Sequence, residues 1–438
     1  MSRVVQEEIF GPVAVVLPFR TAKESIALAN NTKYGLGASV WTENVSLGLE
    51  ACISIKAGAV WFNAHNLFDA AAGFGGYKQS GFGRDGGKEG LMEYIKPAWD
   101  KDFRGGGACK DLKVDLAKFG SVPRQGLPTY HDNVQTTVDA TINGATKPMK
   151  VPTIDKTYKM FYGGKQVRPD GPYSRPIRNP AGEVVGHVGD GNRKDVRNAV
   201  EAAHKAAPGW GKRAAFNRAQ IIYYLAENLE ERRTEFAAKL SAMTGNSEAN
   251  SLREVDLSIQ RLFYWAAYAD KYGGEVQETP LYGATVKIHE PVGVVGIACP
   301  DEFPLLAFVS LLAPAIVRSN AVVIVPSQAY PLAALEFYQV LETSDVPPGV
   351  VNILTGERDH LTKYLAEHQD VDAFWYFGSA EGCKFVETAA AENVKRTWCN
   401  YGRTRAWDNN DQGQGLEFLY HSTQAKNIWI PMGEIFAN

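Results

Sequence analysis

Cysteine is scarce in this sequence, and its pattern argues against disulfide and metal frameworks. The five cysteines, at positions 52, 109, 299, 383 and 399, are odd in number and widely scattered. They form no CxxC pair and no Cys/His spacing typical of a zinc site. We therefore expect thiols in a reducing compartment rather than a secreted, disulfide-bonded domain.

Long apolar runs and blocks of like charge are also lacking. The longest apolar run, near residues 305–317, is too short to cross a bilayer, and the opening MSRVVQEEIFG has no apolar core of signal-peptide type. A net charge of −3 gives no reason to expect nucleic acid or an anionic membrane as partner. We expect a cytoplasmic protein with neither kind of partner.

The sequence does contain a long alternation of strand-like and helix-like segments. At 438 residues, with 45% hydrophobic and 22% charged residues, the chain is long enough for two or three globular domains. Nearly all-apolar runs of strand length lie at 292–298, 321–325, 350–356 and 372–378. Helix-like segments follow them at 305–317, 331–343, 358–367 and 379–391. The pattern predicts an α/β fold with a Rossmann-type parallel sheet covered by helices on both faces.

A sheet of this kind binds ligands beyond the carboxyl ends of its strands. Here the strands are expected to end at Ala298, Val325, Gly356 and Gly378. Ser379 begins the helix after the last strand, and we expect the first N–H groups of that helix to be free to hold a pyrophosphate. The sequence therefore predicts a nucleotide site at this edge.

Four motifs in this stretch resemble one known family. They are PVGVVGIACP followed by FPL, the corner VPSQ followed by PL, VPPGVVNILTG, and the Gly-Ser pair after the last strand. Together and in this order they resemble the nucleotide-binding domain of the NAD(P)-dependent aldehyde dehydrogenase superfamily. The resemblance covers most of the chain outside residues 101–156. It implies an aldehyde as substrate, NAD or NADP as cofactor, and a homo-oligomer.

Residues 1–100 resemble the closing part of an aldehyde dehydrogenase catalytic α/β domain. EEIFGPVAVVLPFR is strand-like from residue 9, so we expect the chain to start inside a fold whose upstream part is missing. A helix over 21–35 and short strands over 36–42 and 59–63 are expected next. Eight glycines between residues 73 and 90, interleaved with aromatic residues, then predict a loop that wraps a site.

The resemblance implies roles for five side chains. Glu8 is expected to hold the nicotinamide ribose, because a carboxylate accepts hydrogen bonds from both hydroxyl groups, and Phe10 to pack on the nicotinamide ring. Ser379 is the favourable cofactor contact that remains in the nucleotide domain. Phe68 and Phe74 match the aromatic lining of the aldehyde tunnel, although either is also compatible with an ordinary core position.

The remainder of the chain divides into three parts. Residues 101–156, rich in Gly, Pro and Thr, are predicted to be a linker or crossover. Residues 157–410 resemble the family's amino-terminal and nucleotide-binding parts, beginning with GGKQV and NPAGEVVG. Residues 411–438 are expected to hold a closing, oligomerisation-type strand and a tail, which 90–99 partly repeat. This order, the end of one copy before a shortened second copy, resembles family 16.

The second copy departs from the family where the chemistry is carried. Glu302 replaces the oxyanion-donating asparagine, and losing one such donor costs roughly 3–4 kcal/mol. Val325 and Gln328 replace the lysine and glutamate of the KPSE motif. Cys399 stands where the general-base glutamate is expected, and no cysteine follows DQGQG at 411–415. We find no residue here suited to be the nucleophile.

We therefore interpret the chain as a C-terminal portion of an NAD(P)-dependent aldehyde dehydrogenase that lacks the nucleophile and is inactive alone. The alternative is a non-catalytic pseudoenzyme, a scaffold or binding subunit that pairs with a separate catalytic chain. In either case we expect the strand near residues 425–430 to pair with another sheet, because its apolar edge would otherwise promote aggregation.

Overall fold

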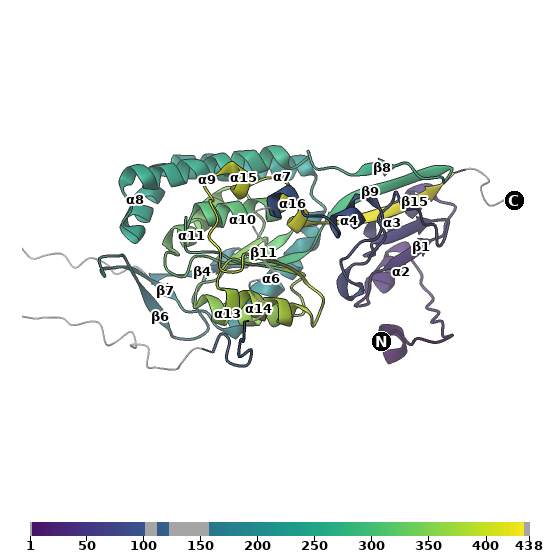
Figure 1. Ribbon diagram of the computed structural model, residues 1–438, viewed down its shortest axis with the longest axis horizontal. Coiled ribbons are helices and arrows are strands. Elements are labelled where there is room, and N and C mark those ends of the chain that lie inside the picture. The colour runs from purple at the N-terminus through teal and green to yellow at the C-terminus, as the bar shows by residue number, and fades with distance from the viewer. Residues whose placement is uncertain (1, 101–111, 122–156, 433–438) are drawn as a thin grey trace, which may run out of the picture.

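The repeated strand and helix pattern of residues 291–402 forms the centre of the larger of two lobes (Figure 1). The computed structural model describes residues 2–100, 112–121 and 157–432. Seven strands form the main sheet, in the spatial order β14 (Arg396–Cys399), β13 (Ala373–Tyr376), β10 (Val294–Ala298), β11 (Ala321–Val325), β12 (Val351–Ile353), β4 (Met160–Tyr162) and β5 (Lys165–Val167). The first five are parallel, while β4 pairs antiparallel with β12 and β5. The predicted parallel sheet is confirmed.

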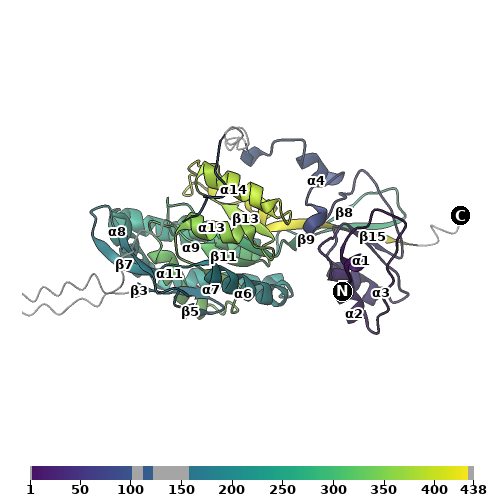
Figure 2. The same ribbon diagram turned by 90° about the horizontal axis from the view of Figure 1, so that it is seen from below.

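Helices cover both faces of this sheet, as the uniformly apolar strands require. One face carries α6 (Arg193–Gly211), α13 (Arg358–Glu367) and α14 (Ala380–Ala390), which Figure 2 shows from below. On the other face lies α10 (Leu306–Val317), covered in turn by α7 (Ala215–Glu231) and α9 (Glu248–Tyr268), with α8 (Arg233–Thr244) beside them. All twelve residues of α10 are buried, so this helix is apolar all round.

The helix predicted over 331–343 is divided into two shorter helices, α11 (Leu332–Glu336) and α12 (Tyr338–Thr343). The backbone tightens at Phe337, with φ −59° and ψ −15°. Its buried ring packs edge-on against Phe308 and Phe236, at centroid distances of 5.6 and 6.5 Å. The helix is therefore interrupted at Phe337, the residue whose ring packs into the core.

Three distant parts of the chain share the sheet of the smaller lobe. Its strands, in spatial order, are β1 (Gly37–Val40), β2 (Ala59–Phe62), β15 (Thr423–Pro431), β9 (Gly283–Pro291) and β8 (Glu275–Gln277). The closing strand β15 is parallel to β2 and antiparallel to β9. The predicted pairing of this strand is confirmed, and Figures 1 and 2 both show β9 and β15 running from the larger lobe into the smaller one.

A buried polar network fastens the first hundred residues to these two strands. The Lys426 ammonium donates to Glu290 Oε1 at 2.9 Å and to the carbonyl groups of Ile53 and Ile55 at 2.7 Å each. The Tyr77 hydroxyl donates to Glu290 Oε2 at 2.9 Å. Because Glu290 lies on β9 and Lys426 on β15, the network joins all three parts of the chain.

The strand predicted from residue 9 is wrong. Residues 3–6 form the short helix α1 (Arg3–Gln6), and residues 7–20 are unpaired backbone in which Phe10 is 91% and Val16 88% exposed. Pro12 and Pro18 have no N–H to donate to a ladder, and no neighbouring strand pairs with this segment in the described part of the chain.

Other elements of the smaller lobe match the sequence only in part. The predicted helix is α2 (Ala22–Asn30), capped by Thr21, but α3 (Val45–Ser54), capped by Asn44, was not predicted. Residues 90–99, which partly repeat the closing strand, contain no strand. They lie in the end of α4 (Gly87–Met92) and run into the 3₁₀ turn η2 (Ala98–Asp100).

The beginning of the second copy has the predicted hairpins. β6 (Ser174–Arg178) and β7 (Val184–Gly189) form a three-stranded sheet with β3 (Thr157–Tyr158), and Gly182 supplies a φ of 83° in their turn. Of the predicted linker, residues 112–121 pack on the larger lobe, where Phe119 stacks on Phe385 at 4.4 Å. The rest of 101–156 lies outside the described residues. The four-part domain division stays a prediction.

Candidate functional site

The two phenylalanines predicted to line an aldehyde tunnel lie together in the smaller lobe. The rings of Phe68 and Phe74 meet edge-on at 4.9 Å, and Phe68 also contacts Trp61 at 5.6 Å. The glycine-rich loop holds Phe74 through two main-chain hydrogen bonds with Asp85, of 2.7 and 2.8 Å. Phe68 is 52% exposed, so this aromatic cluster has an open side. Its role as substrate lining stays a prediction.

The structure does not bring Glu8 or Phe10 to this cluster. Both lie exposed in the unpaired segment after α1. No ring contact or hydrogen bond joins them to Phe68 or Ser379 within the described residues. Their predicted contact with the nicotinamide half of a cofactor is therefore not assembled by these residues alone.

The described cysteines are poorly placed to act as nucleophiles. Cys52, Cys299 and Cys383 are buried. Burial raises the pKa of Cys52 to about 11, and it raises the pKa of Cys299 further, so both thiols stay protonated at neutral pH. Cys399 is half-buried on β14, and Cys109 lies outside the described residues. Among the residues that the structure describes, no cluster could hold a metal ion.

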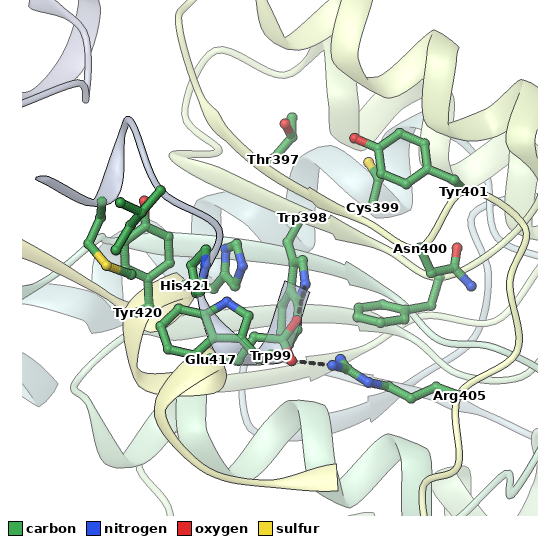
Figure 3. Close-up of a pocket in the computed structure, with 14 residues that line it drawn as sticks. Trp99, Thr397, Trp398, Cys399, Asn400, Tyr401, Arg405, Glu417, Tyr420 and His421 are labelled. Atoms are coloured by element: carbon green, nitrogen blue, oxygen red, sulfur yellow. Dashed lines mark hydrogen bonds and ion pairs between the residues drawn. The ribbon is translucent and has the colours of Figure 1, made fainter. Parts of the chain in front are cut away.

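A pocket of about 390 Å³ opens where β14 ends, between α16 (Leu416–Ser422) and the segment 92–99 (Figure 3). It includes the Cys399 position predicted to replace the general base. Aromatic, aliphatic and polar side chains line it: Met92, Ile95, Pro97, Trp99, Phe377, Thr397, Trp398, Cys399, Asn400, Tyr401, Arg405, Glu417, Tyr420 and His421. We call this the β14 pocket.

A buried ion pair forms the polar wall of the β14 pocket. Arg405 donates to Glu417 Oε2, and the Trp398 indole N–H donates to Glu417 Oε1 at 3.2 Å. The Arg405 guanidinium also lies 5.4 Å from the centre of the Trp398 ring. The His421 ring also stacks on Trp398, with ring centres 4.3 Å apart and an angle of 7° between the two planes. Burial and the charges of Arg396 and Arg405 hold the pKa of His421 well below its ordinary value, so the imidazole is neutral at pH 7.

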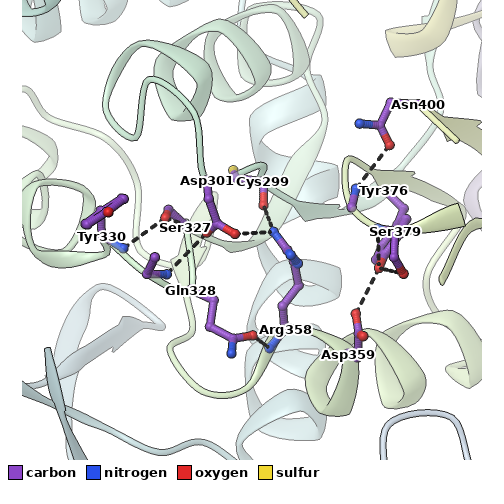
Figure 4. Close-up of polar contacts among 12 residues, drawn as sticks. Cys299, Asp301, Ser327, Gln328, Tyr330, Arg358, Asp359, Tyr376, Ser379 and Asn400 are labelled. Atoms are coloured by element: carbon purple, nitrogen blue, oxygen red, sulfur yellow. Dashed lines mark hydrogen bonds and ion pairs between the residues drawn. The ribbon is translucent and has the colours of Figure 1, made fainter. Parts of the chain in front are cut away.

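The carboxyl edge of the main sheet, predicted to bind a nucleotide, is occupied by a network of the protein's own side chains (Figure 4). Asp301, after β10, accepts from Ser327 Oγ at 2.7 Å and from the Arg358 guanidinium at 3.2 Å. Arg358 also donates to the Cys299 carbonyl at 3.2 Å, and its main-chain N–H donates to Gln328 Oε1 at 2.8 Å. The residues that follow β10, β11 and β12 thus bind one another.

Three N–H groups at the start of α14 are bonded within the protein, so only part of this helix end is free to hold a pyrophosphate. The Ser379 N–H donates to the Tyr376 hydroxyl at 3.2 Å, and the Gly382 N–H to Ser379 Oγ at 3.0 Å. The Gly378 N–H donates to Asn400 Oδ1 at 3.1 Å. Tyr376, the last residue of β13, turns its phenol under this loop, where a Cβ on Gly382 would lie only 2.0 Å from the hydroxyl oxygen.

These residues fit a dinucleotide poorly. Three of the N–H donors near the start of α14 are already bonded to Tyr376, Ser379 and Asn400. Asp359 adds a carboxylate at the same edge, bonded to the Tyr376 hydroxyl at 2.8 Å, whereas the charge of Asp301 is paired with Arg358. Ser379 therefore lies where the sequence predicts, as the N-cap of α14, but its role toward a cofactor stays a prediction.

Several of the residues that define these two sites were not predicted. Tyr376 belongs to an apolar strand run, and only its phenol oxygen marks it as different from the neighbouring Phe374. Arg405, Glu417 and His421 follow no helical or strand period with respect to one another. Their approach depends on α16 folding back toward β14, which no local signal indicates.

The fold defines an α/β protein of the dinucleotide-binding class, and side chains at its binding edge are bonded to one another. The profile of the aldehyde dehydrogenase family matches residues 1–99 and 167–406. The chain belongs to this family.

Named relatives cover only parts of this chain. It is 33% identical over 273 residues to cytosolic 10-formyltetrahydrofolate dehydrogenase of Mus musculus, covering 60% of this chain and 30% of that protein. It is 36% identical over 235 residues to mitochondrial aldehyde dehydrogenase of Rattus norvegicus, covering 52% and 45%. The chain thus spans less than half of the length of either relative. Relatives in Mus musculus also include a cytosolic aldehyde dehydrogenase.

Solved structures agree with the fold. Betaine aldehyde dehydrogenase of Staphylococcus aureus in complex with NAD+ is 28% identical with a TM-score of 0.54, covering 55% of this chain and 49% of that one. NAD-dependent aldehyde dehydrogenase of Sinorhizobium meliloti is 29% identical with a TM-score of 0.54, covering 56% and 50%. Among the described residues, no helix is both long and apolar enough to span a membrane.

Proposed function

We propose that this chain joins the closing part of an aldehyde dehydrogenase catalytic domain to a degenerate second copy that supports it. The plan most resembles family 16, in a cytoplasmic, homo-oligomeric protein that oxidises aldehydes with NAD or NADP. The observation that carries this proposal is the position of β15 between β2 and β9. A strand that follows the second nucleotide-type domain completes the sheet that begins in the first hundred residues.

The buried contacts support a scaffolding role for the second copy. Lys426 and Glu290 from that copy meet Tyr77 and the Ile53 carbonyl from the first part of the chain. Arg84 of the glycine-rich loop also donates to the Ala425 carbonyl at 2.9 Å. The loop that carries Phe74 is therefore fixed by the second copy, and its shape depends on β15.

By itself the chain is proposed to be catalytically inactive. Aldehyde oxidation in this family needs an attacking thiolate, an oxyanion donor and a general base. Glu302 and Cys399 stand where the resemblance expects the donor and the base, and the side-chain network at the carboxyl edge, with three bonded N–H groups at the start of α14, supports weak or absent pyrophosphate binding. The role of the described residues is to position Phe68, Phe74 and the glycine-rich loop for chemistry carried elsewhere.

Two measurements on residues 1–438 test this proposal. Calorimetric titration with NAD and NADP is expected to show no binding below a dissociation constant of about 1 mM. NADH absorbance with a panel of aliphatic and aromatic aldehydes is expected to show no turnover. Micromolar dinucleotide binding contradicts the weak or absent pyrophosphate binding proposed above. Steady turnover that Cys399→Ser abolishes contradicts the scaffolding role.

A second candidate is a non-catalytic subunit that pairs with a separate catalytic chain. The observation that favours it is a run of exposed apolar side chains in an unpaired segment: Ile9, Phe10, Val13, Val15, Val16, Leu17 and Phe19. Activity restored by mixing this chain with a separately expressed catalytic part supports the subunit. Activity restored only by a covalent fusion supports the first proposal.

A further inference from the structure

The β14 pocket takes no part in the proposed scaffolding role, and several flat rings form part of its wall. Trp398 and His421 lie parallel at 4.3 Å, while Tyr420 meets His421 edge-on at 5.2 Å. Trp99 contacts Tyr420 with ring centres 6.1 Å apart and the two planes tilted by 41°. The volume of about 390 Å³ lies within the range of small-molecule sites. A single aromatic ring with one polar substituent matches this space and these walls.

The charges around the pocket select the sign of that substituent. Half-buried Arg396, next to the pocket lining, donates to the carbonyl groups of Tyr420, at 2.9 Å, and Thr423, and it forms no ion pair among the described residues. Its charge is offset more weakly than that of Arg405, which is paired with Glu417, because Arg396 has only the Tyr420 ring at 5.2 Å and the Glu93 carboxylate without ion-pair contact. An anion is favoured here by Coulomb attraction in a poorly solvated site.

A cationic ligand is disfavoured for a separate reason. Three aromatic rings in or beside the wall already face cations of the protein, because the Arg405 guanidinium lies 5.4 Å from the ring centres of Trp398 and Phe418 and that of Arg396 lies 5.2 Å from Tyr420. A second cation in the same space would repel Arg405 and Arg396. The pocket therefore differs from an aromatic cage for an ammonium group.

His421 supplies the polar contact that an anion needs. Its ring lines the pocket, and no hydrogen bond to either ring nitrogen occurs within the described residues. A neutral imidazole carries one N–H that can donate to a carboxylate oxygen. The stacking on Trp398 fixes the plane of the ring and hence the direction of that donor.

We propose that the β14 pocket binds a small planar aromatic monocarboxylate, with its ring against Tyr420 and Trp99 and its carboxylate toward His421 and the side of the pocket nearest Arg396. The proposal concerns binding only and does not depend on aldehyde oxidation. It goes beyond the scaffolding role proposed above. If the carboxylate does not bind, the proposed role of β15 is unaffected, because β15 does not line the pocket.

The test uses benzoate, benzamide and benzylamine, which share one ring and differ in charge. Tryptophan fluorescence and calorimetry of residues 1–438 are expected to give a dissociation constant of about 0.1–1 mM for benzoate. Benzamide and benzylamine are expected to bind at least about tenfold more weakly, because they lack the anionic acceptor. No benzoate binding at about 10 mM, or equal binding of the three probes, overturns the proposal.

Two histidine variants locate the site. His421→Phe keeps a flat ring against Trp398 but removes the N–H, so benzoate binding is expected to weaken about tenfold. His289→Phe is the matched control, because His289 also stacks on an aromatic ring, Tyr272 at 4.2 Å, but does not line the pocket. Its benzoate affinity is expected to stay within about twofold of the parent. Equal loss in both variants, or no loss in either, overturns the assignment.

A third variant keeps the test informative if His421→Phe does not fold. Trp99→Ala shortens a half-buried residue on the rim of the pocket, outside the buried core. It is expected to weaken benzoate binding about threefold to tenfold by removing one ring contact. Unchanged affinity in a folded Trp99→Ala protein contradicts the proposed orientation and overturns the proposal.

Discussion

At the scale of single residues, the stability of the smaller lobe depends on a buried ion pair. The side chain of Lys426 is fully buried and that of Glu290 is 9% exposed. Replacing Lys426 by Met leaves the Glu290 carboxylate without its cation, so we expect the free energy of unfolding to fall by about 3–5 kcal/mol. Urea unfolding measures this change. Lys88→Met, which breaks an exposed pair with Glu275, is the control and is expected to cost less than about 1 kcal/mol.

Asp372 gives a prediction that depends on pH. It accepts a hydrogen bond from the Val294 N–H at 2.8 Å, and desolvation of the carboxyl group raises its pKa to about 6, although part of the residue stays exposed to water. A carboxyl group with a raised folded-state pKa contributes stability that is fully present below its ordinary pKa and is lost as the pH rises through about 6. Asp372→Asn removes this loss, because the amide does not ionise.

The unfolding free energy of Asp372→Asn, relative to the parent, is therefore expected to rise between about pH 5 and 7.5, by less than about 1 kcal/mol because water screens this exposed carboxyl group. The nearby groups His204, Lys395 and Asp370 remain in both proteins, so the difference isolates Asp372. Urea midpoints across this pH range measure it, with the exposed Glu381→Gln as a control expected to show no trend. A difference that does not change with pH means that Asp372 titrates normally.

At the scale of elements, β15 decides whether the smaller lobe forms at all. It is a central strand, bonded on both sides, so its removal exposes the edges of β2 and β9 together. Ending the chain after Ser422 is expected to give aggregated protein in light scattering. Ending it after Met432 removes only the last six residues of the 438-residue chain and is expected to leave a monodisperse protein. A well-behaved protein without β15 would contradict the central role of this strand.

The elements also show which structure the sequence allows one to predict. β10, β11 and β13 are apolar along their whole length because helices cover both of their faces, and that pattern is local. β14, with Arg396 and Thr397, lacks such a run and was not predicted. The segment 7–20 has the composition of a strand, but a strand forms only beside a partner, and composition does not reveal whether the partner is present.

At the scale of the whole molecule, the two candidate sites could be predicted unequally. The carboxyl edge of the sheet follows from strand order, so its place was predictable, whereas the hydrogen bonds that Tyr376 and Arg358 form there depend on side-chain packing. The β14 pocket combines the segment 92–99 with β14 and α16. Residues more than three hundred positions apart line one cavity, and no motif connects them.

The last prediction concerns the protein in which the first hundred residues meet a complete catalytic part. If an upstream segment with the family's GQxC cysteine is joined to this chain, aldehyde oxidation is expected to appear, because only a thiolate can form the hemithioacetal from which hydride leaves. Glu8 is then expected to bind the nicotinamide ribose. Glu8→Gln keeps the shape but loses charged hydrogen bonds of roughly 1.5–3 kcal/mol, so turnover should slow by about one to two powers of ten.

NADH absorbance in single turnovers measures this effect, and Glu7→Gln in the same fusion is the matched control. Glu7 is bonded to Arg3 on the surface, at 2.7 Å, and is expected to change the rate less than about twofold. Equal effects of the two substitutions would show that Glu8 is an ordinary surface carboxylate. If the fusion binds NAD but does not oxidise aldehydes, the joined catalytic part is the inactive one, because the second copy is proposed to supply no reacting atom.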